Sequence, residues 1–122
     1  MAALRSILGA LLALTIGASG VSSAEQLPFQ GAFGAAVGNG CKSYKEETEG
    51  DYLVTYDNGR GYGESGECGC DVTRVQKTGP SAYRLSTICQ CIDGPKRTGQ
   101  AIVVVTSPRE IRFDGRRFLR CK

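Results

Sequence analysis

The segment Cys68-Gly-Cys-Asp-Val-Thr-Arg-Val-Gln-Lys-Thr-Gly-Pro-Ser-Ala-Tyr-Arg-Leu-Ser-Thr-Ile-Cys-Gln-Cys91 decides the fold that we predict. Its centre is the turn Thr78–Ser81, because glycine and proline interrupt strands and favour turns. The runs on either side, 70–77 and 82–91, carry the β-branched and aromatic residues typical of strands. The segment therefore predicts an antiparallel hairpin with a Cys-x-Cys motif at the outer end of each strand.

This turn also predicts which cysteines face each other. In an antiparallel pair the numbers of facing residues add to a constant, and residues two apart share a face. A turn centred on the Gly-Pro pair makes that constant 159. Cys70 then faces Cys89 and Cys68 faces Cys91, on one side of the hairpin. We therefore predict the disulfides Cys70–Cys89 and Cys68–Cys91.

Cys41 and Cys121 remain for each other, and their bridge would tie the N-terminal part of the domain to the last strand. It closes the longest loop, for which a chain-entropy estimate gives about 4 kcal/mol. An even set of six cysteines is typical of a small exported domain. Zinc is the alternative, but zinc sites usually leave two or more residues between paired cysteines, and the Cys-x-x-Cys of redox sites is absent.

Short apolar runs between turns continue along the rest of the chain, without helical periodicity. Asn58-Gly59 predicts a type I′ hairpin turn, which needs positive φ at both central residues. The run 100–106 is the most apolar and is the candidate central strand. The predicted strands lie near 29–33, 52–56, 60–65, 70–77, 82–91, 100–106, 110–113 and 116–121. The predicted fold is all-β, with about eight short antiparallel strands in a meander that forms a small barrel or a flattened sandwich.

The first 24 residues predict a secretory signal peptide. Arg5 precedes an apolar run, 7–16, and small residues follow it up to Ala24. A membrane-spanning helix needs about 20 apolar residues, and this run is roughly half as long. We expect cleavage after Ala24, a single domain over 25–122, no membrane span, and a periplasmic or secreted location.

The charges divide the predicted domain into two halves. From Lys45 to Asp71 eight acidic residues stand against two basic ones, and basic residues dominate after Val72. One interpretation is attraction between neighbouring strands. The other is an acidic face for a basic partner, or a basic face for an anionic surface. The net charge of +3 for the whole chain gives no reason to expect a nucleic-acid partner.

Several short motifs together resemble a known group of proteins. They are Phe29-Gln-Gly31-Ala-Phe33, Cys41, Cys70-Asp-Val72-Thr-Arg-Val75, Tyr83-Arg-Leu85-Ser-Thr-Ile-Cys89 and Asp114-Gly115-Arg-Arg-Phe118-Leu-Arg120-Cys121. With them the chain resembles small exported four-cysteine β-domains of Gram-negative bacteria, mostly of unknown function, with lipocalin-like or inhibitor-like barrels. The resemblance implies the pairs Cys70–Cys89 and Cys41–Cys121. It makes Cys68 and Cys91 additions, places Phe33 where the family has tryptophan, and carries no catalytic residues.

The sequence offers little catalytic chemistry. It contains no histidine, which excludes histidine triads and imidazole acid–base catalysis. The string Gly61-Tyr-Gly63-Glu-Ser-Gly66 matches a dinucleotide fingerprint in letters, but no helical pattern follows it, so we interpret it as a glycine-rich strand or turn. A carboxylate pair, Glu64 with Glu67, is the remaining route to glycoside hydrolysis. We expect no enzymatic activity, no metal and no cofactor.

Three functional hypotheses follow. The first is a binding module, an inhibitor of an enzyme such as a lysozyme or a protease, whose partner is a basic protein. Its candidate interaction loop is Gly59–Glu67, with Tyr62, Glu64, Ser65 and Glu67. The second is a structural or surface component of the cell envelope, and the third is a carbohydrate hydrolase or lectin. A protruding acidic loop would favour inhibition, and a lined cavity would favour ligand binding.

Overall fold

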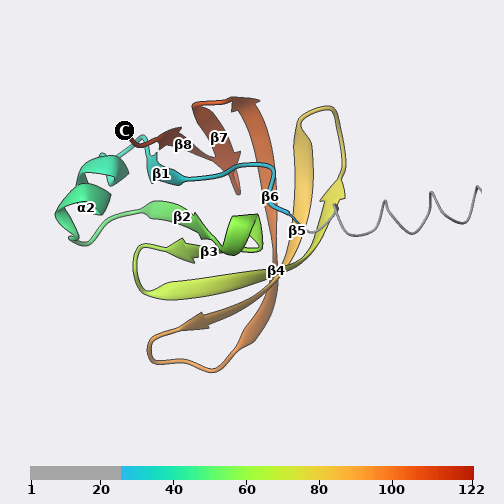
Figure 1. Ribbon diagram of the computed structural model, residues 1–122, viewed down its shortest axis with the longest axis horizontal. Coiled ribbons are helices and arrows are strands. Elements are labelled where there is room, and N and C mark those ends of the chain that lie inside the picture. Colours follow the sequence, from blue (N-terminus) through green and yellow to red (C-terminus); the bar gives the residue numbers. More distant parts are fainter. Residues whose placement is uncertain (1–25) are drawn as a thin grey trace, which may run out of the picture.

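Each strand pairs antiparallel with its neighbours in the chain, and the last strand returns to pair with the first (Figure 1). The computed structural model describes residues 26–122, so the predicted signal peptide lies outside the described residues. The strands are β1 (Ala32–Ala35), β2 (Tyr52–Tyr56), β3 (Gly61–Glu64), β4 (Cys68–Lys77), β5 (Ala82–Cys91), β6 (Arg97–Ser107), β7 (Glu110–Phe113) and β8 (Arg116–Arg120). This is the predicted all-β meander of eight strands.

The pairing of β1 with β8 decides between the two predicted architectures. Phe33 pairs with Arg120 and Gly34 with Leu119, which closes the sheet into a barrel. A closed barrel leaves neither strand as a free edge, which removes a site of unwanted pairing with other chains.

All three predicted disulfides are present: Cys41–Cys121, Cys68–Cys91 and Cys70–Cys89. The hairpin register was nevertheless predicted for a partly wrong reason. Next to the turn, Lys77 pairs with Tyr83, so the numbers of facing residues add to 160. A β-bulge between Val72 and Arg74 then changes the constant to 159 before the cysteines are reached. The longer turn and the bulge compensate each other, because each inserts one unpaired residue.

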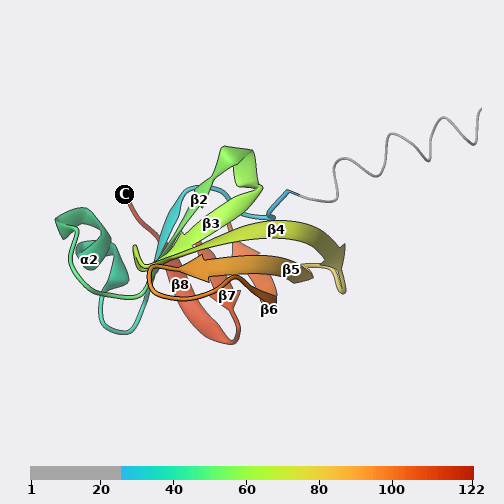
Figure 2. The same cartoon turned by 90° about the horizontal axis from the view of Figure 1, so that it is seen from below.

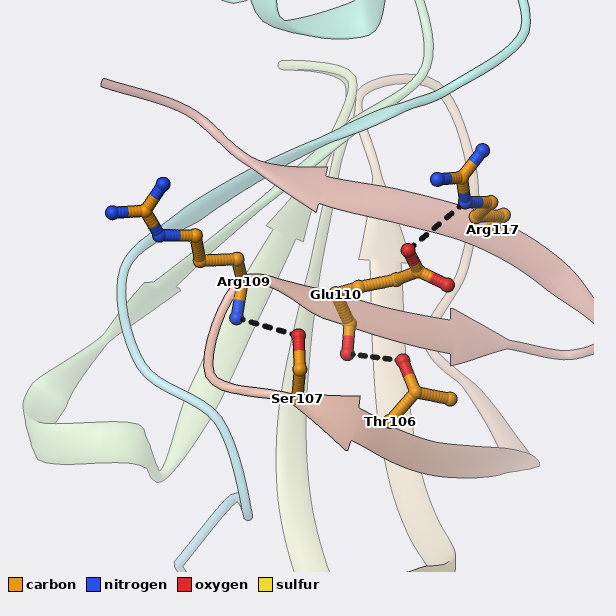
Figure 3. A network of polar contacts seen from close by, with 5 residues as sticks. All are labelled: Thr106, Ser107, Arg109, Glu110 and Arg117. Carbon is orange, nitrogen blue, oxygen red and sulfur yellow. Dashed lines mark hydrogen bonds and ion pairs between the residues drawn. The ribbon is translucent and has the colours of Figure 1, made fainter.

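Threonines occupy both bulges of the barrel described here. In β4 the extra residue is Thr73, whose hydroxyl donates to the carbonyl oxygen of Ser86 at 3.1 Å. In β6 the register shifts around Thr106, whose hydroxyl donates to the carbonyl oxygen of Glu110 at 2.9 Å (Figure 3). Each side chain thus bonds to the partner strand where the backbone ladder is interrupted, and bulges add the local twist that a small barrel requires.

The turn between β2 and β3 has the predicted geometry. Asn58 and Gly59 have φ values of 55° and 83°, and the amide of Arg60 donates to the carbonyl oxygen of Asp57 at 3.2 Å. Asp57 also has a positive φ, 52°, which the sequence did not indicate.

The domain also contains one short α-helix, although its sequence shows no helical periodicity. The helix α2 (Gly40–Glu46) begins at Asn39, whose side-chain oxygen accepts from the amide of Lys42 at 3.4 Å. Figure 2 shows α2 at one end of the barrel, on the side where the chain ends, as the Cys41–Cys121 bridge requires. Seven residues with Gly40 as the buried one carry no apolar stripe, so hydrophobic periodicity could not reveal this helix.

Two glycines allow the start of α2 to lie against β1. A Cβ on Gly34 would come closer than 3.0 Å to backbone atoms of Gly40 and Cys41. A Cβ on Gly40 would come equally close to backbone atoms of Ala35 and Asp51. The backbones of the helix and the strand are therefore in direct contact.

The barrel interior is filled by alternate residues of the strands and by two residues that precede them. The buried apolar residues are Leu27, Phe29, Phe33, Ala35, Leu53, Tyr62, Cys70, Val72, Leu85, Ala101, Val103, Ile111, Phe113 and Phe118. Phe29 was predicted to begin the first strand, but β1 begins at Ala32, after Gly31 with φ of 105°. The Phe29 ring instead packs edge-on against Phe33 and Phe113, with centroids 5.5 and 6.5 Å apart.

The bridge between the ends of the domain should stabilise it most. The double variant Cys41→Ser/Cys121→Ser should lose about 4 kcal/mol of unfolding free energy, because this bridge closes the longest loop. Cys68→Ser/Cys91→Ser should lose about 1 kcal/mol or less, since Cys70–Cys89 still closes almost the same loop. Urea denaturation of the oxidised proteins measures both values, and equal losses would contradict the loop-length argument.

Gly34→Ala should destabilise the domain by about 2 kcal/mol or more, because the added methyl group meets backbone rather than a movable side chain. Gly79→Ala is the matched control, since its Cβ would make an ordinary 3.5 Å contact with Ala82 and should change stability by less than about 0.5 kcal/mol. Thermal unfolding followed by circular dichroism compares the two. Equal melting temperatures would show that α2 is not seated against β1.

Candidate functional site

The predicted interaction loop is partly strand. Within Gly59–Glu67, residues Gly61–Glu64 form β3, and the turn that follows spans Ser65–Glu67. Tyr62 is 2% exposed, and its ring packs edge-on against Phe113 with centroids 5.3 Å apart. Burial, and then the charges of Glu64 and Asp114, raise the pKa of Tyr62. Tyr62 therefore belongs to the core and has no surface to offer a partner.

Glu64 and Ser65 lie in a cavity at one mouth of the barrel, which we call the mouth pocket. Its volume is about 160 Å³. It is lined by Asp51, Tyr52, Leu53, Glu64, Ser65, Phe113, Asp114, Arg116 and Phe118. Leu53, Phe113 and Phe118 are core residues, so the pocket has an apolar floor beneath a polar rim.

Glu64 is the half-buried acid of the mouth pocket. Burial is the main cause that raises its pKa above the ordinary value of 4.5, and the negative charges of Asp114 and Asp51 add to it. The carboxyl group therefore holds its proton to a higher pH than a glutamate in water. A raised pKa in a concave site is typical of a functional group.

The neighbouring charges of the pocket are held in place. Arg116 donates to Asp51 at 2.7 Å, and its guanidinium lies over the Phe118 ring, 5.5 Å from the centroid. Asp114 begins the turn between β7 and β8, and its side chain accepts from the amide of Ile102 at 2.8 Å. Arg116 offsets Asp51, which leaves Glu64 and Asp114 as the uncompensated acids of the pocket.

The charge separation along the sequence produces one ion pair between the two halves. Within residues 26–122 the ion pairs are Arg116 with Asp51 and Arg117 with Glu110, the latter at 3.0 Å across β7 and β8 (Figure 3). Attraction between the halves across neighbouring strands is therefore not what holds the barrel together. Arg120 serves a structural purpose, donating to the carbonyl oxygens of Gln30 and Pro108 while lying over the Phe33 ring.

The structure thus brings together two of the four predicted site residues, Glu64 and Ser65, and separates the others. Glu67 is exposed and lines hollows on the outside of the barrel. Sequence reasoning missed Asp51, Asp114 and Arg116, which come from segments far apart in the chain. Asp114 and Gly115 form the turn between β7 and β8, and the position of this turn beside Glu64 follows from barrel closure alone.

The chemistry available at the mouth pocket is that of carboxylates. Across the described residues no group of three or more His, Cys, Asp or Glu side chains is arranged to hold a metal ion. In the same part of the chain, none of the helices has the length and apolar character needed to cross a bilayer. The three disulfides are consistent with an extracytoplasmic protein.

Comparison with protein-family models, curated protein sequences and solved structures finds no significant match. The structure therefore defines only a class for this chain: it is a small eight-stranded antiparallel β-barrel with three disulfides. The resemblance to exported four-cysteine β-domains stays a prediction.

Glu64→Gln should make the domain more stable near neutral pH. A carboxyl group with a raised folded-state pKa binds more protons in the folded than in the unfolded chain, so its contribution to stability falls as pH rises above the unfolded value. Glutamine removes this loss. The variant should melt at a higher temperature than the wild type at about pH 7 and at a similar temperature at about pH 4.

Glu67→Gln is the matched control for this experiment, because it removes one negative charge from an exposed position outside the mouth pocket. Differential scanning calorimetry of the three proteins at both pH values makes the comparison. A Glu64→Gln variant less stable than the wild type at neutral pH would contradict the assigned environment of Glu64.

Proposed function

We propose that this protein is a small extracytoplasmic binding module whose mouth pocket receives one cationic group, the side chain of a lysine or arginine on a basic partner protein. The observation that carries the proposal is the half-buried Glu64 in a cavity that has an apolar floor and further acids at its rim.

The size of the pocket supports a single side chain as the occupant. Sites for drug-sized ligands and cofactors usually enclose about 300–1,000 Å³. The mouth pocket, at about 160 Å³, is smaller than that range. A long basic side chain fits the arrangement of its lining, because the methylene stem packs on Leu53 and Phe118 while the charged end reaches the acids.

The electrostatics support a cation. Glu64 and Asp114 lack an ion-pair partner among the described residues, whereas Asp51 is paired with Arg116. A positive charge placed beside Glu64 would favour its ionised form, which the neighbouring acids now disfavour. Binding should therefore release a proton and strengthen as pH rises through the pKa of Glu64.

Inhibition of a basic enzyme, such as a lysozyme or a protease, fits the proposal when the captured side chain lies beside the enzyme's own cleft. This mode of inhibition differs from the one predicted from the sequence. Here the mouth pocket receives a side chain of the enzyme, and no acidic loop of this protein enters the enzyme's cleft. A structural component of the envelope is the alternative function, and it requires no such pocket.

The test is binding to a lysozyme, used as a basic probe, measured by isothermal titration calorimetry at low salt. Glu64→Gln/Asp114→Asn should weaken binding by about tenfold or more, as expected for the loss of charge-assisted contacts. The control Glu49→Gln/Glu67→Gln has the same net charge but an intact mouth pocket, and should weaken binding much less. Raising the salt to about 0.15 M should weaken binding of all the proteins but leave most of this difference, because exposed charges are then screened beyond about 8 Å whereas partly buried pairs are screened much less.

Equal weakening by the two double variants would show that binding depends on net charge and does not use the mouth pocket. If the wild type does not bind the lysozyme, and lysozyme activity is unchanged at every ratio of added protein, the inhibitor hypothesis is ruled out and the structural function is favoured.

A further inference from the structure

The outer face of the barrel has a floor of bare backbone where β3 and β4 pair. Tyr62 and Cys70 point inward, so their neighbours Gly61, Gly63 and Gly69 occupy outward positions. Gly63 pairs with Gly69, which places the two glycines side by side on adjacent strands.

The fold does not require glycine at two of these positions. Neither Gly63 nor Gly69 has a positive φ, and a Cβ on either would meet no atom closer than 3.7 Å. Glycine inside a strand costs about 0.5–1 kcal/mol relative to alanine. An unneeded glycine in a strand often marks a place where a ligand comes close to the backbone.

A groove, which we call the outer groove, lies over Gly69 at one side of this floor. It has a volume of about 420 Å³ and is lined by Tyr56, Glu67, Gly69, Asp71, Ile88, Gln90, Cys91, Ile92 and Lys96. A second hollow of about 530 Å³ shares Glu67, Cys91 and Ile92 with the first. The two hollows therefore adjoin at the end of β5.

Tyr56 is fixed as an aromatic wall of the outer groove. Its ring covers Gly61, where a Cβ would overlap it, and its hydroxyl lies 3.0 Å from the carbonyl oxygen of Cys70 and 3.1 Å from Asp71. Burial and the hydrogen bond to Asp71 raise the pKa of Tyr56 to about 12, so the hydroxyl remains a donor near neutral pH. Tyr56 is nevertheless 40% exposed.

Two more exposed apolar side chains complete the walls. Ile88 is 37% exposed and Ile92 is 75% exposed, and both line the outer groove with Tyr56. Polar groups stand between them, notably the carboxylate of Asp71 and the amide of Gln90. The outer groove thus combines apolar side chains with planar groups that can form hydrogen bonds.

The floor of the outer groove is rigid. Gly69 pairs with Gln90, and the disulfides Cys68–Cys91 and Cys70–Cys89 cross-link the pairs on either side of it. A preorganised surface loses less conformational entropy when a ligand binds.

We infer that the outer groove binds an oligosaccharide of neutral or amino sugars. Pyranose rings present apolar C–H faces, which suit Tyr56 and the two isoleucines, and equatorial hydroxyls, which suit Asp71 and Gln90. Glu67 and Asp71 disfavour an anionic chain, although Lys96 lies at the rim. Gly69 and Asp71 already pair with strands on both sides, so this part of β4 offers no free edge to an added peptide strand. Two adjoining hollows favour several sugar units over one.

This inference is independent of the proposed function. The linings of the outer groove and the mouth pocket share no residue. Variants in one can therefore fail without affecting the other.

The test is an NMR titration of the ¹⁵N-labelled, oxidised protein with four probes. Chitopentaose and cellopentaose represent the proposed ligands, a galacturonate oligomer is the anionic comparison, and pentalysine represents a basic peptide. At least one neutral or amino-sugar probe should shift the amide signals of Gly69, Asp71 and Gln90, and the galacturonate should not.

Gly69→Val should weaken sugar binding by about tenfold or more, because its side chain would fill the floor of the groove. The melting temperature should stay equal or rise, since valine favours strands. Ile92→Ser removes an exposed wall and should also weaken binding while leaving the fold intact. Gln100→Val, on the exposed side of β6 and outside the groove, is the matched control and should leave the affinity unchanged.

Three results would overturn the inference. One is the absence of shifts at the groove with both neutral probes. Another is an affinity that neither Gly69→Val nor Ile92→Ser reduces. The third is a groove response to pentalysine alone, which would assign the surface to a basic peptide. Signal changes confined to Glu64 and Asp114 would support the mouth pocket and count against the outer groove.

Discussion

The facing of two Cys-x-Cys motifs across β4 and β5 is the constraint on which the rest of this structure depends. Because side chains alternate along a strand, the covalent pairs Cys70–Cys89 and Cys68–Cys91 fix which residues of both strands point inward. A slip of one residue would turn Val72 and Leu85 toward solvent. The same register places Gly69 and Gln90 on the outside, so core and outer groove are set together.

Strand β3 shows how one short segment serves three parts of the molecule. Tyr62 fills the interior, Glu64 reaches the mouth pocket, and the alternate glycines form part of the outer floor. A small barrel has few residues, so neighbouring positions on one strand contribute to different parts of the molecule, one to the core and the next to the surface. Glu64 lies two residues after the core residue Tyr62 on β3, and its carboxyl group is partly buried. This burial is the main cause that raises its pKa.

Much of the fold could be predicted because strands and turns have local signals. The ranges 52–56, 82–91 and 110–113 were predicted to the residue, and Asn58-Gly59 adopted its turn. The errors have physical causes. The helix α2 is held by its contact with β1 and by Cys41, which local patterns do not report. The bulge at Thr73 leaves no sequence signal beyond a threonine, and its effect was concealed by a turn one residue longer than predicted.

The sequence by itself determined the disulfide pairing, the antiparallel meander and the acidic character of the segment around Glu64, because these depend on spacing, turn residues and composition. The tertiary structure alone decided between barrel and sandwich, since that choice is the pairing of β1 with β8 across almost the whole chain. It also placed Tyr62 in the core and brought Asp51, Asp114 and Arg116 to Glu64. Contacts of that range depend on how the sheet closes, and closure is a property of all eight strands at once.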